Sequence, residues 1–402
     1  MKDSRRRAFF ASIAVALVLQ SCTGASSGPA TETASDNEPV VGNEIVLGMF
    51  STFTGPAAAA GIPARDGVQV WISEVNAAGG INGRKLRLVS YDDAASPQEA
   101  ISAARKLIDQ DNVFALICLS GGSTLGVLPQ IVDAKIPAVT CINATKRLIE
   151  PPQDKYVYRI YANEIPQSYA IADYLGGTLK SKRPAIIHTT LDFGVAGAKY
   201  SEEQLQSKYN TMYVAKTPFN VGDQDFTAQL LQIKQANPDA LVVHALAADA
   251  GRIVRQAKDL GLNVPMVGGG ATPTPLLPQA AGEASVGFVA PWVFPVLPDQ
   301  DTPEVTQYTA KLKQYVYPNG LPPGRPSLYD MTGYIAGQVM GEALKRAGQR
   351  LTRTALLKVL DSLENFKPQL GFAVSFTKSH EGTDKVVMAR IGKNLKWEIY
   401  TP

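Results

Sequence analysis

The stretch that decides the fold is residues 45–91, IVLGMFSTFTGPAAAAGIPARDGVQVWISEVNAAGGINGRKLRLVSY. It opens with a continuous apolar run at residues 45–50, which is typical of a strand buried on both faces. After the turn Thr54-Gly55-Pro56, apolar residues recur at helical spacing over residues 64–77. Two glycines end this helix, and residues 86–91 predict a second strand. A strand, a helix and a strand in this order indicate a βαβ unit and a parallel sheet.

The same alternation continues along the chain in two series. The first predicts strands at residues 45–50, 86–91, 114–118, 138–141 and 156–160, and helices at 64–77, from Ser96-Pro97 onward and at 125–134. The second predicts strands at 185–188, 212–215, 240–244 and 266–267, and helices at 168–179, 197–209, 226–236 and 249–260. A third section predicts a helix at 328–347 and strands at 372–376 and 385–389.

Two series predict an α/β fold with two doubly wound parallel-sheet lobes joined by a three-segment hinge. The chain is expected to cross between the lobes near residues 163, 288 and 374. The first lobe then holds residues 44–162 and 290–373, and the second holds residues 163–289 and 374–402. In sheets of this kind, ligands bind beyond the carboxyl ends of the strands.

Composition excludes several classes of protein. The 402 residues are 45% hydrophobic and 19% charged, which supports two packed domains and excludes a disordered chain, a disulfide-dense mini-protein and a multi-span membrane protein. The formal net charge is +3, but removing residues 1–21 removes four of 39 basic and one of 36 acidic residues and leaves 35 of each. No basic field then remains to attract nucleic acid.

The N-terminus has the pattern of an export signal. A basic segment, Lys2 with three arginines, precedes the apolar residues 8–19, so residues 1–21 are expected to be a secretory signal peptide. The end of this segment, Leu19-Gln20-Ser21-Cys22, resembles a lipobox, so we expect a lipid on Cys22 that anchors an extracytoplasmic protein to the membrane. A plain signal peptide with an incidental cysteine is the alternative, and Arg6-Arg7-Ala8-Phe9-Phe10 leaves twin-arginine export open. Residues 22–43 are rich in Ser, Thr, Gly and Pro and are expected to be a disordered tether.

Two further cysteines, Cys118 and Cys141, each end a predicted strand. If the two strands are parallel neighbours, the sulfur atoms lie within reach of a disulfide, and an oxidising compartment permits that bond. Two free, buried thiols are the alternative.

Seven short stretches resemble, in the same order, the type I periplasmic binding proteins of the branched-chain amino acid transporter family. They are Thr54-Gly55-Pro56 with Gly61, residues 74–84 (EVNAAGGINGR), Tyr91-Asp92-Asp93 with Pro97, Asn143-Ala144-Thr145, Asp192-Phe193-Gly194, residues 222–226 (GDQDF) and residues 253–262 (IVRQAKDLGL). The resemblance implies a two-lobed clamshell that closes on a small solute and docks on the permease of an ABC importer, without a cofactor. A sensor of the same fold that feeds a signalling partner is the alternative.

The resemblance also assigns a ligand site. In the family, two loops that follow strands of the first lobe bind the carboxylate end of the ligand, and we carry this role to Ser120, Gly121, Ser123, Asn143 and Thr145. Their loop neighbours Gly122, Cys141 and Ala144 complete the candidate set. Free N–H groups at the start of a helix suit an acceptor oxygen. The simpler interpretation is that these residues make turns and a helix cap.

The chain departs from the family where amino acid binders hold the ammonium group with an acid and aromatic hydroxyls. The matching positions are Ala60, Phe193, Leu246 and Gly270. An ammonium group has three donors and needs acceptors. Either Asp249 or Asp192 replaces the missing acid, or the ligand is not a standard amino acid. The sequence therefore favours a small amide, a carboxylic acid or an apolar neutral molecule, with Phe193, Leu246, Asp249 and Gly270 as further candidate contacts.

Catalysis has little support in the sequence. Gly121-Gly122-Ser123-Thr124-Leu125 lacks the final glycine of a nucleophile elbow, and Gly268-Gly269-Gly270 lacks the lysine of a phosphate loop. The three histidines show no metal-ligand spacing. His188 and His244 end predicted strands and either contact ligand or pack in the core, and the same two alternatives hold for Trp292 and Tyr329. His380 is expected to be solvated.

Overall fold

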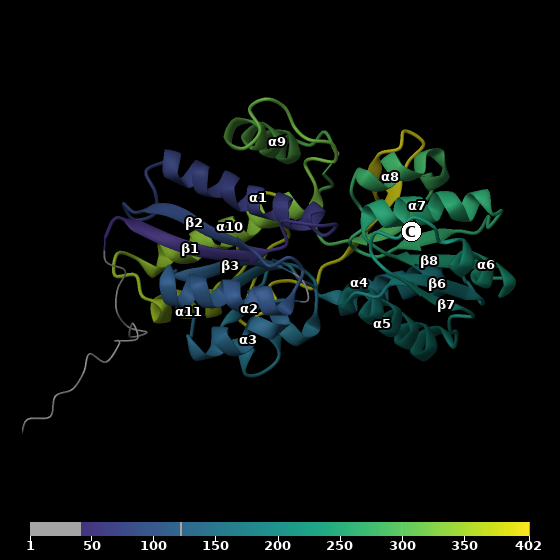
Figure 1. Ribbon diagram of the computed structural model, residues 1–402, viewed down its shortest axis with the longest axis horizontal. Helices are drawn as coiled ribbons and strands as arrows, with labels where there is room; N and C mark the ends of the chain where they lie inside the picture. The colour runs from purple at the N-terminus through teal and green to yellow at the C-terminus, as the bar shows by residue number, and fades with distance from the viewer. Residues whose placement is uncertain (1–41, 121–122, 299, 402) are drawn as a thin grey trace, which may run out of the picture. The chain divides into compact units, whose positions relative to one another are not determined.

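The computed structural model describes residues 42–401, apart from residues 121, 122 and 299. The expected signal peptide, Cys22 and nearly all of the expected tether lie outside the described residues, as do Gly121 and Gly122. The described part contains two β-sheets with helices on their faces (Figure 1). The α/β class with two sheets, expected from the alternating pattern, is therefore confirmed.

The first sheet has five parallel strands in the order β2-β1-β3-β4-β5. They are β1 (Glu44–Ser51), β2 (Lys85–Asp92), β3 (Ala115–Ser120), β4 (Ala138–Ile142) and β5 (Val157–Arg159). Helices α1 (Ala58–Ala77) and α10 (Leu328–Ala347) pack together on one face, and α2 (Pro97–Arg105) and α3 (Thr124–Asp133) cover the other (Figure 1). Helices α9 (Pro303–Tyr315) and α11 (Arg353–Asp361) contact α1 and α10 respectively. As expected, β1 lies inside the sheet with most of its residues buried.

The second sheet has seven strands in the order β12-β11-β10-β9-β8-β6-β7. They are β6 (Pro184–Thr189), β7 (Lys216–Phe219), β8 (Ala240–His244), β9 (Met266–Gly268), β10 (Val289–Trp292), β11 (Val387–Ile391) and β12 (Trp397–Tyr400). Its helices are α4 (Glu164–Asp173), α5 (Asp192–Tyr209), α6 (Thr227–Gln235), α7 (Ala247–Asp259) and α8 (Leu276–Ala281). Strands β6 to β10 run parallel, and the last two strands pair antiparallel at one edge.

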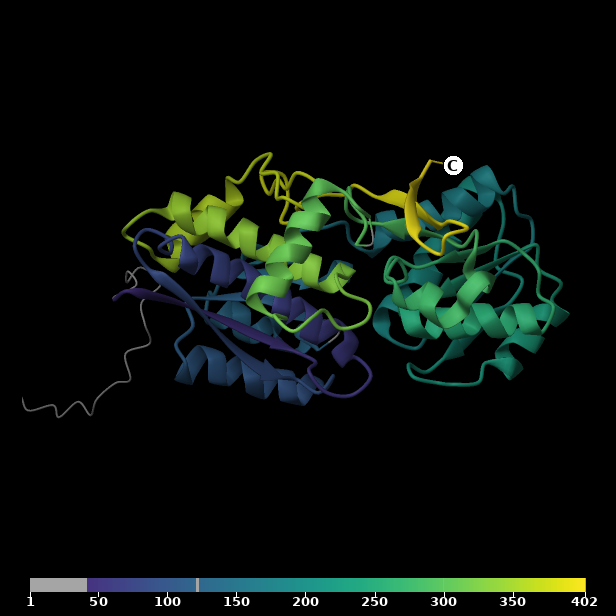
Figure 2. The ribbon, with the colours of Figure 1, turned by 90° about the horizontal axis from the view of Figure 1, so that it is seen from above.

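Two segments near the C-terminal end of the chain pack beside the first sheet and extend the second (Figure 2). The yellow-green helices α10 and α11 lie beside the purple and blue elements of the first sheet. The yellow end of the chain, with β11 and β12, lies beside the elements of the second sheet. Residues 290–292, which the sequence assigns to the first lobe, pair in the second sheet as part of β10.

One predicted strand is displaced and another does not form. The strand predicted at residues 212–215 begins later, as β7 at Lys216, although Val214 and Ala215 already make backbone hydrogen bonds of 2.8 and 2.9 Å to Pro184 and Ile186 of β6. Residues 372–376 contain only an isolated bridge between Phe366 and Val374.

A close crossing of α1 and α10 fixes the beginning of α10. A Cβ atom on Gly67 would lie 1.9 Å from the carbonyl oxygen of Asp330, and one on Gly333 would lie 2.1 Å from that of Ala64. Both distances are far below van der Waals contact, so only glycine allows the two backbones to touch. The crossing places the first two turns of α10 against the middle of α1.

We expect Gly333→Ala to lower the free energy of unfolding by about 1–3 kcal/mol, since the added methyl group overpacks the helix crossing. Urea unfolding measures this change. Gly126→Ala is the matched control, because Gly126 lies inside α3 and its Cβ would meet no atom closer than 3.6 Å. There alanine is expected to be neutral or to stabilise by roughly 0.5–1 kcal/mol. Equal losses in both variants would contradict the close crossing.

Candidate functional site

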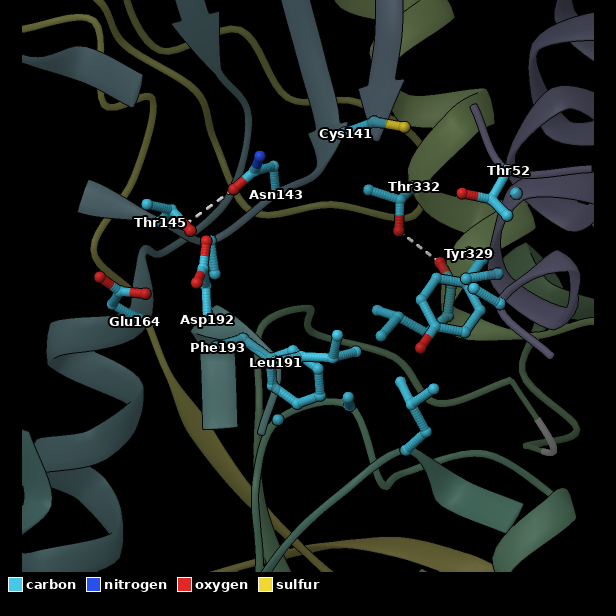
Figure 3. A pocket seen from close by; sticks show the side chains of 18 of the residues that line it. Thr52, Cys141, Asn143, Thr145, Glu164, Leu191, Asp192, Phe193, Tyr329 and Thr332 are labelled. Carbon is cyan, nitrogen blue, oxygen red and sulfur yellow. Dashed lines mark hydrogen bonds between the residues drawn. The ribbon is translucent and has the colours of Figure 1, made fainter. Parts of the chain in front are cut away.

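A pocket of about 440 Å³ lies at the carboxyl ends of strands from both sheets. Its lining includes the last residue of β1, the loop after β4, and the loops that follow β6, β8 and β9 (Figure 3). The first turns of α1, α4, α5 and α10 complete it. The polar lining residues are Ser51, Thr52, Ser123, Asn143, Thr145, Tyr161, Glu164, Gln167, Ser168, Thr190, Asp192, His244, Tyr329 and Thr332.

Most of the site residues expected from the sequence line this pocket. They are Ser123, Cys141, Asn143, Ala144, Thr145, Phe193, Leu246 and Gly270. Ser120 is the last residue of β3; its side chain lies outside the described part, together with Gly121 and Gly122. Ala60, Asp192 and Tyr329 also line the pocket.

Asp249 does not belong to the described lining. It is 3% exposed, forms an ion pair with Arg252 three residues along α7, and accepts a hydrogen bond from the Gly222 N–H at 3.4 Å. Burial raises the pKa of this carboxyl group, and Arg252 opposes that shift. Of the two acids that the sequence offered for the ammonium group, Asp192 lines the pocket and Asp249 pairs with Arg252.

Asp93 was not singled out as a site residue, but it organises one wall of the pocket. Its carboxylate is fully buried and accepts hydrogen bonds from the hydroxyls of Thr52 at 2.6 Å and Ser123 at 2.7 Å. These two residues come from the loop after β1 and from the start of α3. One acid that directly follows β2 thus connects two pocket loops.

The structure joins Cys118 and Cys141 in a disulfide, with Cα atoms 4.6 Å apart. Both cysteines fall at shifts in the ladder between β3 and β4, where Leu119 pairs with Thr140 and Ser120 pairs with Ile142. The bond therefore links the ends of two neighbouring strands, immediately before the two loops expected to contact ligand.

Arg159, the last residue of β5, holds one of these loops. Its side chain is fully buried and donates to the carbonyl oxygens of Asn143 at 2.9 Å and Thr145 at 2.8 Å. It also forms a bidentate ion pair with Glu381, with N–O distances of 2.8 and 2.6 Å. A second donor, the amide of Asn163, reaches the same carboxylate at 3.2 Å. Arg159 was not among the site residues expected from the sequence, although it is a lone charge inside the apolar run at residues 156–160.

Glu164 begins α4 and brings an unsatisfied carboxylate oxygen to the pocket. Glu164 lines the pocket and is only 7% exposed. Its Oε1 accepts from the Lys146 N–H at 3.1 Å, while Oε2 is buried without a partner. Burial raises the pKa of Glu164; the charges of Asp192 and Glu381 add to that shift, and the Lys146 N–H and Arg159 oppose it. Figure 3 shows Glu164, Asp192 and Thr145 on the same side of the pocket.

The histidines and Trp292 have distinct environments. His244 lines the pocket, and burial, aided by the nearby His188, lowers its pKa to about 4, so the ring is neutral at pH 7. Trp292 is fully buried and donates its indole N–H to the Val296 carbonyl at 2.7 Å, outside the pocket lining. His380 is not solvated as expected: it stacks on Tyr158 with centroids 3.9 Å apart and contacts Asp361 at 3.0 Å.

The described residues contain no cluster of three or more His, Cys, Asp or Glu side chains arranged to hold a metal ion. No helix in the same part of the chain is both long and apolar enough to span a bilayer.

The sequence pattern of the periplasmic binding proteins matches residues 44–396, most of the chain. The chain belongs to the periplasmic binding protein family. One relative is an amino acid binding protein of Pseudomonas aeruginosa, 29% identical over 242 residues. That match covers 60% of this chain and 64% of the Pseudomonas protein, so the chain spans less than two thirds of that relative's length. A Leu/Ile/Val-binding protein homolog of Brucella suis biovar 1 is 26% identical over 329 residues, 82% of this chain and 85% of that protein.

Solved periplasmic binding proteins have the same fold. A branched chain amino acid ABC transporter protein from Thermus thermophilus with bound valine superposes with a TM-score of 0.81 at 22% identity, covering 89% of this chain and 95% of the other. A type 1 periplasmic binding protein from Bordetella pertussis gives a TM-score of 0.75 at 25% identity, covering 89% and 100%. The type I fold expected from the resemblance is thus confirmed.

We expect Glu164→Gln to stabilise the ligand-free protein at about pH 7.5. Because the pKa of Glu164 is higher in the folded protein than in the unfolded chain, the ionised group lowers the free energy of unfolding above its folded-state pKa. This loss disappears as the pH falls toward the ordinary carboxyl pKa of about 4.3. The melting temperature of the variant should therefore exceed that of the parent at high pH, and the difference should shrink on acidification. A variant that melts lower at pH 7.5 would contradict this assignment.

Arg159→Met is expected to cost about 3 kcal/mol or more, because it leaves the Glu381 carboxylate and two loop carbonyls without their partner. Arg87→Met is the matched control: Arg87 pairs with Glu44 at 2.8 Å, but both side chains are about half exposed. Exposed pairs contribute about 1 kcal/mol or less. Chemical unfolding of both variants tests the difference, and similar losses would refute a special role for Arg159.

Proposed function

We propose that this protein is the extracytoplasmic solute-binding component of an ABC importer. It binds a small polar or amphipathic solute, such as an amino acid, an amide or a small carboxylate, and delivers it unchanged to a permease. The observation that carries this proposal is a pocket to which strand ends of both sheets contribute. Relatives named as amino acid or Leu/Ile/Val-binding proteins, and a structural neighbour with bound valine, support the class of solute.

Binding in such a pocket couples the ligand to the arrangement of the two sheets. Asn143 and Thr145 belong to a loop of the first sheet, whereas Asp192, Phe193 and Leu246 follow strands of the second. A solute that contacts both sets favours the state in which they lie close together. The measured affinity then reports the contact energy minus the free energy needed to reach that state.

The partners follow from the same proposal. The signal-like residues 1–21 direct export, and lipidation of Cys22 keeps the protein at the membrane surface. Residues 22–43 act as a tether, which raises the effective concentration of the binding protein near its permease. Nucleic acid is not a partner of a chain with 35 basic and 35 acidic residues after residue 21.

A thermal-shift screen of the full chain against amino acids, amides and short acids tests the proposal. A ligand that binds only the folded state adds about 2.7 kcal/mol at a hundredfold excess over its dissociation constant, so the melting temperature rises. Ala60→Trp should abolish the shift, because Ala60 lines the pocket.

The control for that variant is Ala59→Trp, which places the same side chain on an exposed position of the same helix turn. It should keep the full shift. If the melting-temperature shift persists in Ala60→Trp, the solute binds outside this pocket. The absence of any shift across the screen contradicts a solute-binding role.

A further inference from the structure

Three hydroxyl groups in the pocket already donate their only proton to the protein. Thr52 and Ser123 donate to the carboxylate of Asp93, and Thr332 donates to the carbonyl of Leu328. A carbonyl and an ionised carboxylate can only accept. Each of these hydroxyls therefore has lone pairs, but no proton, left for a ligand. This part of the pocket wall accepts hydrogen bonds.

The charged groups of the pocket also favour a ligand that donates hydrogen bonds. Its described lining contains two acids, Glu164 and Asp192, but neither lysine nor arginine. His244 does not offset the two acids because burial keeps it neutral at pH 7. A ligand carboxylate placed here meets like charge from these two acids, whereas a cationic group meets compensating charge.

Glu164 gives the strongest indication that the pocket accepts hydrogen bonds from a ligand. One oxygen is bonded to the Lys146 N–H, and the other is buried without a partner in a residue that is only 7% exposed. A buried acceptor without a donor is costly, and an ionised one more so. Asp192, which lines the same side of the pocket, has no hydrogen bond or ion pair to the described residues and is exposed enough to meet a solute.

Positions that differ from the resembling proteins leave room for this arrangement. At Gly270 a Cβ atom would lie 1.9 Å from Oε1 of Gln167, so a side chain fits there only if the end of Gln167 moves. Phe193 and Leu246 offer apolar surface and no acceptor. The acceptors for a cationic group must come from elsewhere in the lining, and Glu164 and Asp192 are the ionised candidates.

We propose that the pocket selects solutes by an ammonium group that donates to Glu164 and Asp192, with an apolar tail toward Phe193 and Leu246, and that a ligand carboxylate is dispensable. This inference rests on the proposed solute-binding function and narrows it to small aliphatic amines, with or without a carboxyl group. It reverses the preference for amides, acids and neutral molecules that the sequence favours.

Four solutes with one branched aliphatic tail separate the alternatives. Leucine carries both charged groups, 3-methylbutylamine keeps only the ammonium group, 4-methylpentanoate keeps only the carboxylate, and 4-methylpentanamide is neutral. Isothermal titration of the full chain at about pH 7 should give dissociation constants for leucine and 3-methylbutylamine within about tenfold of each other. The acid and the amide should bind about a hundredfold more weakly or not at all, as expected for loss of a charge-assisted hydrogen bond of about 1.5–3 kcal/mol.

Glu164→Gln and Asp192→Asn should each weaken 3-methylbutylamine binding by about tenfold to a hundredfold. Glu203→Gln makes the same chemical change on the exposed surface of α5 and should leave the dissociation constant unchanged. Glu164→Gln is expected to fold, since it removes an unsatisfied buried charge, and its melting curve verifies this.

The outcomes separate this inference from the function on which it rests. Tighter binding of 4-methylpentanoate than of 3-methylbutylamine, or unchanged amine binding in both pocket variants, overturns the inference and leaves the solute-binding function standing. If none of the four solutes binds while another solute of the screen does so in the pocket, the amine preference is likewise wrong. If no solute binds at all, the proposed function fails and the inference fails with it.

Discussion

The buried guanidinium of Arg159 is the constraint on which the site depends. A charge taken out of water must find partners, and a guanidinium with five donors needs several of them in one plane. Arg159 finds them in the carbonyls of Asn143 and Thr145 and in the carboxylate of Glu381. Those groups are 14 to 222 residues away along the chain. The hydrogen bonds of this one side chain therefore hold the loop after β4 in place and connect the segment before β11 to the end of β5.

The same constraint positions the pocket acid. Asn163 donates its amide to Glu381 and caps α4 by accepting from the Ile165 N–H, and Glu164 is the next residue. Burial raises the pKa of the Glu164 carboxyl group; the nearby charge of Arg159 opposes that shift, and the charge of Asp192 adds to it. The protein therefore donates a hydrogen bond to only one of the two carboxylate oxygens of Glu164. A ligand that brings donors completes the set, so binding and charge compensation become the same event.

Local signals in the sequence predicted the alternating strands and helices and the loops at their carboxyl ends, because apolar periodicity and turn residues act over a few positions. They also placed Cys118 and Cys141 at neighbouring strand ends. Asp249 is absent from the described pocket lining and pairs with Arg252 one helical turn away, a contact that the sequence pattern does not show. Glu164 and Arg159 were missed because their roles depend on partners brought together only by the fold. The start of β7 was misplaced for the same reason, since the neighbouring strand β6 decides where the ladder begins.

The position of the two pocket acids explains how ionised carboxylates are tolerated in a partly buried site. Glu164 and Asp192 are the first residues of α4 and α5, helices of 10 and 18 residues, and the N-terminus of a helix carries partial positive charge. At the start of α4 that field offsets part of the cost of burying the Glu164 carboxylate. An acid on the loop at Gly270 would lack this support and would displace the end of the Gln167 side chain. Two helix N-termini therefore allow this chain to hold acceptors for a cationic group although the positions used by resembling proteins carry small or apolar residues.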